Sequence, residues 1–336
     1  MSIFELNNEQ RREMIDMQQL FEGWRSVEQE FRHSYRGRMR WRKIKGYEYL
    51  YRIVGSAVRS EKSLGRRSPE TERLFTEYQS ARARLKRRET SLRKKIEGRA
   101  RINRAFGLGQ MPKIAANILR KLDRAGLLGS KLIVVGTHAL YGYGAKAGVI
   151  FQGDLVATRD IDLMFDTRRR MSLALAPDLG ASGIIGLLKG VDSTFEHKPG
   201  EYRAMNDDGY YVDLIRPMEQ REACNSINGL ADNDLVPVAI LGLQWLMNAP
   251  RFEVTVIADD GLPLYMNSID PRVYALYKQW LATKAKGRDP LKQRRDREQA
   301  KAVAHVAKDY LGLRFNAKDL SALPIELVKA AQALTN

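Results

Sequence analysis

The chain has 336 residues, a formal net charge of +17 at pH 7 and one cysteine, Cys224. A single cysteine excludes an internal disulfide and a cysteine-ligated metal cluster, and no apolar run approaches the roughly 20 residues of a membrane span. The N-terminus also lacks the basic-then-apolar layout of a signal peptide, so we expect a cytoplasmic protein with no membrane partner.

Most of the positive charge lies in the first third of the chain. Residues 1–104 carry 27 Lys and Arg against 14 Asp and Glu, a net charge of +13. This excess indicates a polyanionic partner, with nucleic acid as the first candidate, although charge can also serve solubility alone. Helical spacing of apolar residues predicts helices over 9–35 and 82–104, and the second of these has 11 basic and 2 acidic residues.

Aromatic and basic residues are interleaved between residues 31 and 51. Such a mixture can hold single-stranded nucleic acid by stacking and charge. The alternative is that the rings pack this region onto the next domain. The residues are Phe31, Tyr35, Trp41, Tyr47, Tyr49 and Tyr51, together with Arg32, Arg36, Arg38, Arg40, Arg42, Lys43 and Lys45.

An apolar run over residues 132–135 predicts a buried strand in the middle of the chain. Gly136 and Thr137 follow it at the start of a predicted helix. The free backbone N–H groups at such a helix start can bind phosphate. His138, next along the chain, fits the surface of that helix.

Two aspartates on one predicted strand are candidate metal ligands. In a strand, Asp160 and Asp162 lie on one face and Ile161 and Leu163 on the other. Adjacent carboxylates repel each other unless a cation lies between them, which suits Mg²⁺. A second apolar strand over 210–215 carries one charge, Asp213, and would supply the third carboxylate of a two-metal site.

Two acidic sequences, Asp207-Asp208-Gly209 and Asp259-Asp260-Gly261, fit hairpin turns better than metal ligands. The paired strands would be 202–204 with 210–215, and 252–258 with 262–266.

Helices complete the chain. Asp270 is expected to cap one helix, which carries Lys278, and Asp296 is expected to open another. The fold class is therefore α+β, with a mixed sheet and flanking helices. The predicted regions are a basic helical N-terminal region (1–110), a core (111–266) and a C-terminal helical region (267–336).

The order of strand, Gly-Thr, Asp-x-Asp and lone strand aspartate resembles the active-site signature of the DNA polymerase β-like nucleotidyltransferase superfamily. Nearly the whole chain also resembles one bacterial family with this fold, which is distantly similar to the nucleotidyltransferases of toxin–antitoxin and abortive-infection systems. One departure is Gly144, near which that family has an acidic residue. The matching segments are YEYLYR (47–52), KSLGRRSPETE (62–72), LRKLDRAGLLG (119–129), VVGTHALYGY (134–143), ATRDIDLMFD (157–166), GYYVDLIRP (209–217), DPRVYALYKQWL (270–281) and RDPLKQRRDREQA (288–300).

The resemblance implies a minimal polymerase β-like core that moves a nucleoside monophosphate from an NTP to an acceptor hydroxyl with Mg²⁺ or Mn²⁺. Asp160, Asp162 and Asp213 would be the catalytic and metal-binding residues. The residues expected to bind the nucleotide are Gly136, Thr137, Lys278, Arg288, Arg295 and Asp296.

The acceptor is predicted by charge and by analogy. The basic N-terminal region makes RNA, tRNA-like by analogy with the toxins, the first candidate. A toxin or defence role with an antitoxin partner is conceivable on the same analogy. Two alternatives stay open: an inactive nucleotidyltransferase fold used as a nucleic-acid-binding module, and an enzyme that modifies a small molecule or a protein.

Overall fold

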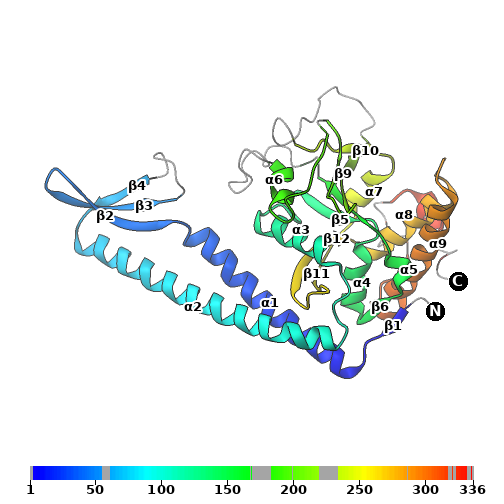
Figure 1. Ribbon diagram of the computed structural model, residues 1–336, viewed down its shortest axis with the longest axis horizontal. Helices are drawn as coiled ribbons and strands as arrows, with labels where there is room; N and C mark the ends of the chain where they lie inside the picture. Colours follow the sequence, from blue (N-terminus) through cyan, green and yellow to red (C-terminus); the bar gives the residue numbers. More distant parts are fainter. Residues whose placement is uncertain are drawn as a thin grey trace. The chain divides into compact units, whose positions relative to one another are not determined.

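The computed structural model describes residues 3–54, 61–166, 168, 183–198, 200–218, 234–285, 287–316, 320, 323–330 and 334 (Figure 1). The chain forms two compact units, one of residues 1–12 and 103–336 and the other of residues 13–102. The division into three predicted regions remains a prediction. By packing, the predicted core and the C-terminal helices belong to one unit.

The larger unit contains a mixed sheet, as predicted for an α+β chain. Strand β7 is parallel to β9 and antiparallel to β5, and β8 forms the predicted hairpin with β9. The strand order is β10 (Val238–Ile240), β9 (Tyr211–Pro217), β7 (Asp160–Phe165) and β5 (Leu132–Val135), with β8 (Arg203–Met205) also paired to β9.

The alternation of side chains along the strands divides the interior into two cores. On β7, Ile161 and Leu163 enter one core, and Met164 enters the other. The first core lies against α3 (Lys113–Arg124), α6 (Gly183–Lys189) and the hairpin of β11 (Arg251–Ile257) and β12 (Pro263–Ile269). The second lies against α4 (Ala139–Ala147), α7 (Leu243–Asn248), α8 (Pro271–Thr283) and α9 (Pro290–His305).

Shorter elements complete the larger unit. They are β1 (Ile3–Glu5), paired with β6 (Val149–Phe151), and α5 (Gly153–Val156), the π-helical segment η4 (Val306–Tyr310) and α10 (Ile325–Ala330). No helix in the described part of the chain is both long enough and apolar enough to cross a membrane.

The start of α9 corrects one prediction. Asp296 does not open a helix: α9 begins at Pro290, and the Asp289 carboxylate accepts hydrogen bonds from the backbone N–H groups of Leu291 and Lys292. The sequence Asp289-Pro290 repeats the cap-and-proline signature of Asp270-Pro271, which opens α8 as predicted. Asp296 therefore lies inside α9 and presents its side chain to neighbouring elements.

The smaller unit combines two helices with a sheet. The predicted helices over 9–35 and 82–104 lie within α1 (Asn8–Ser34) and α2 (Pro69–Ala105). The residues between these helices form a three-stranded antiparallel sheet, where only helices were predicted. Its strands are β2 (Arg38–Ile44), β3 (Tyr47–Ile53) and β4 (Glu61–Arg66). The arginines that occupy alternate positions of β2 obscured the strand pattern, because a strand is normally recognised by alternating apolar residues.

Candidate active site

Strand register places the predicted aspartates in one row across the sheet. Asp162 on β7 is directly opposite Asp213 on β9, and Asp213 is directly opposite Arg203 on β8. Since directly paired residues point to the same face of a sheet, these three side chains share a face. Asp160 also lies on it, because Ile161 and Leu163 point into the core on the opposite side. This is the face that α4, α8 and α9 cover.

Gly136 lies directly against Asp162. It has a φ of +67°, and a Cβ atom at this position would lie 2.0 Å from Asp162 Oδ2. A side chain therefore cannot be accommodated here without moving the carboxylate. The Gly-Thr sequence has a role that the sequence analysis did not anticipate, because it lets the end of β5 turn into α4 close to the aspartate pair.

The local charge makes Asp162 the most perturbed carboxylate of the row. Loss of hydration, followed by the charges of Asp160 and Asp213, raises the pKa of Asp162 to about 7. The positive charges of Lys278 and Arg203 oppose this rise. Three carboxylates on adjacent positions thus carry more negative charge than the neighbouring cations offset at Asp162.

Arg203, which the sequence analysis did not single out, forms a bidentate ion pair with Asp213. Its Nε donates to Asp213 Oδ1 at 2.7 Å and its Nη2 donates to Oδ2 at 2.6 Å. The Arg203 guanidinium lies 4.7 Å from the centroid of the Tyr211 ring. Hydrogen bonding to Asp213 raises the pKa of Arg203, which stays fully charged. Both oxygens of the third carboxylate therefore have a partner already.

The donor chemistry fits a divalent cation at two of the three aspartates. No group of three or more His, Cys, Asp or Glu side chains within the described ranges is arranged to hold a metal ion. Asp160 and Asp162 offer carboxylate oxygens, the ligands that Mg²⁺ and Mn²⁺ prefer, and the raised pKa of Asp162 reflects negative charge that a cation would offset. Asp213 would have to release Arg203 before it could bind a metal.

A buried charge cluster joins α8 and α9 beside this row. Lys278 Nζ donates to Asp296 Oδ1 at 2.8 Å, and Arg288 Nε donates to Asp296 Oδ2 at 2.8 Å. Asp296 is completely buried and Lys278 is 6% exposed. Burial lowers the pKa of Lys278, and the charge of Asp296 acts against this. Three of the predicted nucleotide-binding residues are thus in mutual contact, with two cations sharing one carboxylate.

Arg295 lies by the segment that leads into β7. Its Nη1 donates to the backbone oxygen of Ala157 at 3.1 Å. Thr158, the next residue, donates a hydrogen bond from its hydroxyl to Asp160 Oδ1. The structure therefore brings Arg295 close to the first aspartate of the pair, two residues beyond its own contact.

Gln299 is a second residue that the sequence analysis missed. Its amide nitrogen donates to Thr137 Oγ1 at 3.2 Å and to the backbone oxygen of Leu155 at 2.7 Å, and its amide oxygen accepts from the Tyr274 hydroxyl at 3.2 Å. Gln299 is completely buried and Thr137 is 6% exposed. This network links α9 and α8 to the Gly-Thr turn. Gln299 lies three residues after Asp296, so both face the same side of α9.

His138 is not on the helix surface, as was expected, but completely buried. Its Nε2 lies 3.1 Å from the Tyr210 hydroxyl. Burial lowers the pKa of His138 to about 4, although the neighbouring Asp160 acts in the opposite direction. The imidazole is therefore neutral near pH 7, and it fills space under the Gly-Thr turn.

Gly144, the departure from the resemblance, is a packing position. A Cβ atom at this residue would lie 2.6 Å from the backbone oxygen of Val149. An acidic side chain consequently has no room at this place in α4.

Carboxylates on adjacent strands beside buried cationic side chains form the kind of site that handles nucleotide phosphates. The sequence model of a family described as nucleotidyltransferase matches residues 113–324, a range that contains every predicted site residue. The chain therefore belongs to this nucleotidyltransferase family. Such enzymes transfer a nucleoside monophosphate and generally use an NTP and a divalent metal. No curated protein and no solved structure matches the chain.

Proposed function

We propose that the chain transfers a nucleoside monophosphate from an NTP to an acceptor hydroxyl on a minimal polymerase β-like core. The observation that carries the proposal is the position of Asp162. It lies between Asp160 and Asp213 on one face of the sheet, against the Gly136 turn, within the residues that match the family.

Asp160 and Asp162 would hold Mg²⁺ or Mn²⁺, and Asp213 would join them after releasing Arg203. When bound, the metal would offset the negative charge of the phosphates. Gly136 and Thr137 begin a helix without a side-chain cap, so backbone N–H groups of this turn would bind the β and γ phosphates. Lys278, Arg288 and Arg295 supply positive charge, and Asp296 positions two of them.

The chemical step forms a bond between the acceptor oxygen and the α phosphorus of the NTP. The bond from that phosphorus to the oxygen that bridges the α and β phosphates breaks, and pyrophosphate leaves with the bonding electrons. The acceptor loses its hydroxyl proton, and Asp213 is the residue proposed to take it up. For this, Asp213 requires a free carboxylate oxygen, so the Arg203 contact has to open during turnover.

The proposed acceptor is RNA, with tRNA-like molecules first, because the basic N-terminal region favours a polyanion. A toxin or defence role with an antitoxin partner is the biological setting suggested by the resemblance of the sequence. A small-molecule or protein acceptor is the enzymatic alternative.

One observation favours a second candidate function, an inactive fold that binds nucleic acid. Arg203 occupies both oxygens of the third carboxylate, as a permanent cation would do in a site that no longer binds metal. Metal-dependent binding of an NTP separates the two candidates, since a pure binding module has no need of it.

The test is incubation of the purified chain with each α-³²P-labelled NTP, Mg²⁺ or Mn²⁺, and total RNA, followed by a denaturing gel. Wild type should label an RNA band, and Asp162→Asn should reduce labelling by about 100- to 1,000-fold, the effect of several kcal/mol of lost charge stabilisation. Label in the protein or small-molecule fraction instead would identify the other acceptor class.

The control is Asp208→Asn, which changes an exposed carboxylate in the β8–β9 turn, where asparagine is well tolerated. It should retain wild-type labelling. Asp162→Asn removes a repelled carboxylate, so its melting temperature should not fall. Full activity of Asp162→Asn, or the absence of both labelling and metal-dependent NTP binding in wild type, would refute the proposal.

A further inference from the structure

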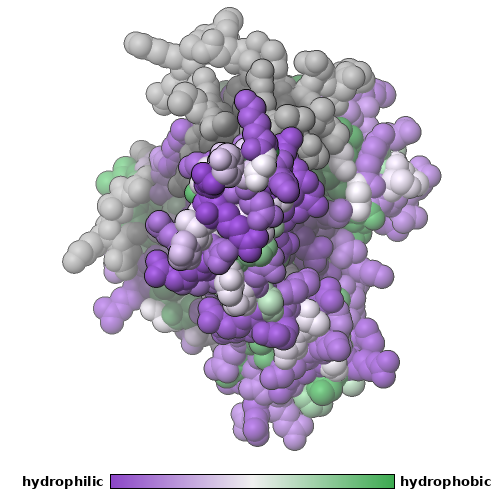
Figure 2. All heavy atoms as spheres, turned by 90° about the vertical axis from the view of Figure 1, so that its left-hand side faces the viewer, coloured by the Kyte–Doolittle hydropathy of each residue, from purple (hydrophilic) through white to green (hydrophobic). Residues whose placement is uncertain are grey.

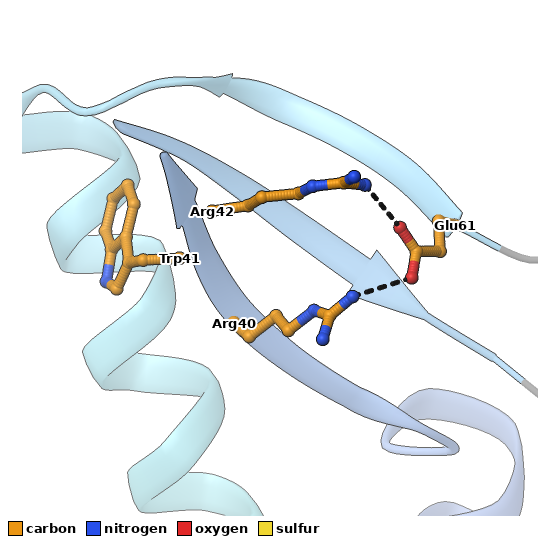
Figure 3. A pocket seen from close by; sticks show the side chains of 4 residues that line it. All are labelled: Arg40, Trp41, Arg42 and Glu61. Atoms are coloured by element: carbon orange, nitrogen blue, oxygen red, sulfur yellow. Dashed lines mark hydrogen bonds and ion pairs between the residues drawn. The ribbon is translucent and has the colours of Figure 1, made fainter. Parts of the chain in front are cut away.

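The register of the sheet in the smaller unit assigns each side chain to one of two faces. Arg40 is opposite Tyr51, and Arg42 is opposite Tyr49, so these four share a face. Trp41 is opposite Leu50 and points to the other side. In Figure 3, Arg40 and Arg42 extend together toward Glu61 on β4, and Trp41 extends away from them toward the helix.

The inner face packs on α2. The Trp41 ring lies 5.7 Å from the Phe75 ring, and Leu50 is completely buried. The Arg52 guanidinium lies 5.8 Å from the centroid of the Tyr78 ring, which is itself buried. Aromatic residues on this side therefore serve the stability of the unit.

The outer face carries tyrosines in a row with arginines on both sides. Tyr47, Tyr49 and Tyr51 follow one another along the central strand β3, and strand geometry spaces successive ones by about 6.8 Å. Arginines flank this row from both neighbouring strands: Arg38, Arg40 and Arg42 from β2 and Arg66 from β4. Tyr47 is 48% exposed, and the Arg40 and Arg42 side chains are 46% and 54% exposed.

Contacts on the outer face hold rings and guanidinium groups together. The Arg66 guanidinium lies 3.5 Å from the Tyr47 ring centroid, and the Arg42 guanidinium lies 5.9 Å from that of Tyr51. Glu61 pairs with both Arg40 and Arg42, at 2.9 and 3.4 Å, at the bottom of a shallow hollow. One carboxylate shared by two arginines leaves the surface positive. In Figure 2, the side on which Figure 1 shows this sheet is mostly hydrophilic.

We propose that this outer face binds single-stranded nucleic acid, with bases stacked on the tyrosine row and phosphates bound by the flanking arginines. A flat sheet that presents aromatic rings between cationic side chains suits unpaired bases, whose faces are free to stack. A duplex buries those faces and would use the arginines alone. As the surface that holds an RNA acceptor, the face rests on the proposed transferase function, but as a binding surface it does not.

The experiment measures binding of the full-length chain to a fluorescein-labelled single-stranded RNA 12-mer by anisotropy, without NTP, over a series of salt concentrations. Tyr47→Leu/Tyr51→Leu keeps apolar bulk but removes two stacking rings, and should weaken binding by 10- to 100-fold, flagged as roughly the loss of one or two stacked bases. Tyr47→Phe/Tyr51→Phe keeps the rings and should bind as wild type. This pair controls for folding.

Arg40→Ala/Arg42→Ala should weaken binding and lower the slope of log K against log salt by about 1–2, one for each lost phosphate contact. The matched control is Arg73→Ala/Arg93→Ala, which removes two exposed charges from α2 in the same unit and should leave the slope nearly unchanged. Asp162→Asn should bind RNA like wild type. Binding is thus tested separately from transfer.

Three outcomes would overturn the proposal. The first is the absence of binding to the single strand. The second is binding that neither sheet variant weakens, or duplex binding that depends equally on the tyrosines. The third is a wild-type dimer, seen by sedimentation velocity, that the tyrosine variants dissociate, since the face would then be an interface between copies of the chain.

Discussion

Arg203 donates two hydrogen bonds to Asp213, at 2.7 and 2.6 Å, from the strand that is hydrogen-bonded to β9. The pair is adjacent to Asp162, which is directly opposite Asp213 on the other neighbouring strand. One strand partner of Asp213 is therefore a carboxylate and the other a guanidinium. The affinity of this row for a metal depends on which of them Asp213 serves.

Replacing Arg203 should strengthen metal binding. In Arg203→Gln, Asp213 loses its bidentate partner and becomes available as a metal ligand. Since the Arg203 side chain is 40% exposed, the pair is worth about 1 kcal/mol, so the Kd for Mn²⁺ should fall by about 5-fold. Titration of Mn²⁺ followed by electron paramagnetic resonance measures this directly.

The control for this effect is the double variant Arg203→Gln/Asp213→Asn. It should bind Mn²⁺ no more tightly than Asp213→Asn alone, because the gain acts through the Asp213 carboxylate. An unchanged Kd in Arg203→Gln would mean that Asp213 belongs to the ion pair and not to the metal site.

Gln299→Leu should destabilise the larger unit and disturb the Gly-Thr turn. It leaves the Thr137 hydroxyl, the Leu155 carbonyl and the Tyr274 hydroxyl without their buried partner. Unpaired buried polar groups of this kind cost about 1–3 kcal/mol in unfolding free energy. Tyr274→Phe removes one hydrogen bond only and should cost less. If both variants melt with wild type, the network has no role in stability.

If the Thr137 turn binds phosphate, Gln299→Leu should also raise KM for the NTP more than it lowers kcat, since the turn would be displaced while the aspartates stay in place. Steady-state labelling at several NTP concentrations separates the two constants. A fall in kcat alone would assign Gln299 to a different part of the reaction.

Lys278→Met should be more damaging alone than in combination with a change at Asp296. Alone it leaves a completely buried carboxylate with half of its ion pairing, which costs about 3–5 kcal/mol. In Lys278→Met/Asp296→Leu the buried charge is gone, and Arg288, whose side chain is 28% exposed, can turn to solvent. Urea unfolding of both variants, with exposed Lys292→Met as control, tests this non-additivity.

The sequence predicted the aspartate row but not its cationic partner. Period-2 alternation separates Asp160 and Asp162 from Ile161 and Leu163, and burial in the structure agrees. Arg203 lies in a hairpin whose pairing was also predicted, so counting back from the Asp207-Asp208-Gly209 turn would have placed it opposite Asp213. The information was local, but it became visible only when register was followed across three strands.

Gln299 and the sheet of the smaller unit were missed for different reasons. An incorrect helix start at Asp296 placed Gln299 in a first turn, where its common face with Asp296 is not apparent. On β2, the charged residues that alternate with Met39 and Trp41 belong to an outer face with no apolar neighbour, and apolar periodicity does not detect such a face. Contacts between distant segments, such as Gln299 with Thr137, follow only from tertiary structure.

His138 should make the larger unit less stable in acid. Its folded pKa of about 4 lies below its ordinary value of 6.5, so between these values the unfolded chain binds more protons than the folded one. Stability is therefore fully present above about pH 6.5 and is lost as pH falls toward 4, by up to about 3 kcal/mol. His138→Gln cannot titrate, yet keeps a polar partner for the Tyr210 hydroxyl.

The measurement is urea unfolding between pH 4 and 7.5 in a Trp24→Phe/Trp41→Phe background, where Trp245 and Trp280 report on the larger unit. His138→Gln should be less stable than wild type at pH 7.5 because of lost packing, and the difference should shrink on acidification. Asp162, with its raised pKa, contributes the opposite slope to both proteins and cancels in the difference. His305→Gln, at an exposed site, should follow wild type throughout. Parallel curves for His138→Gln and wild type would show that the buried imidazole does not govern the acid response.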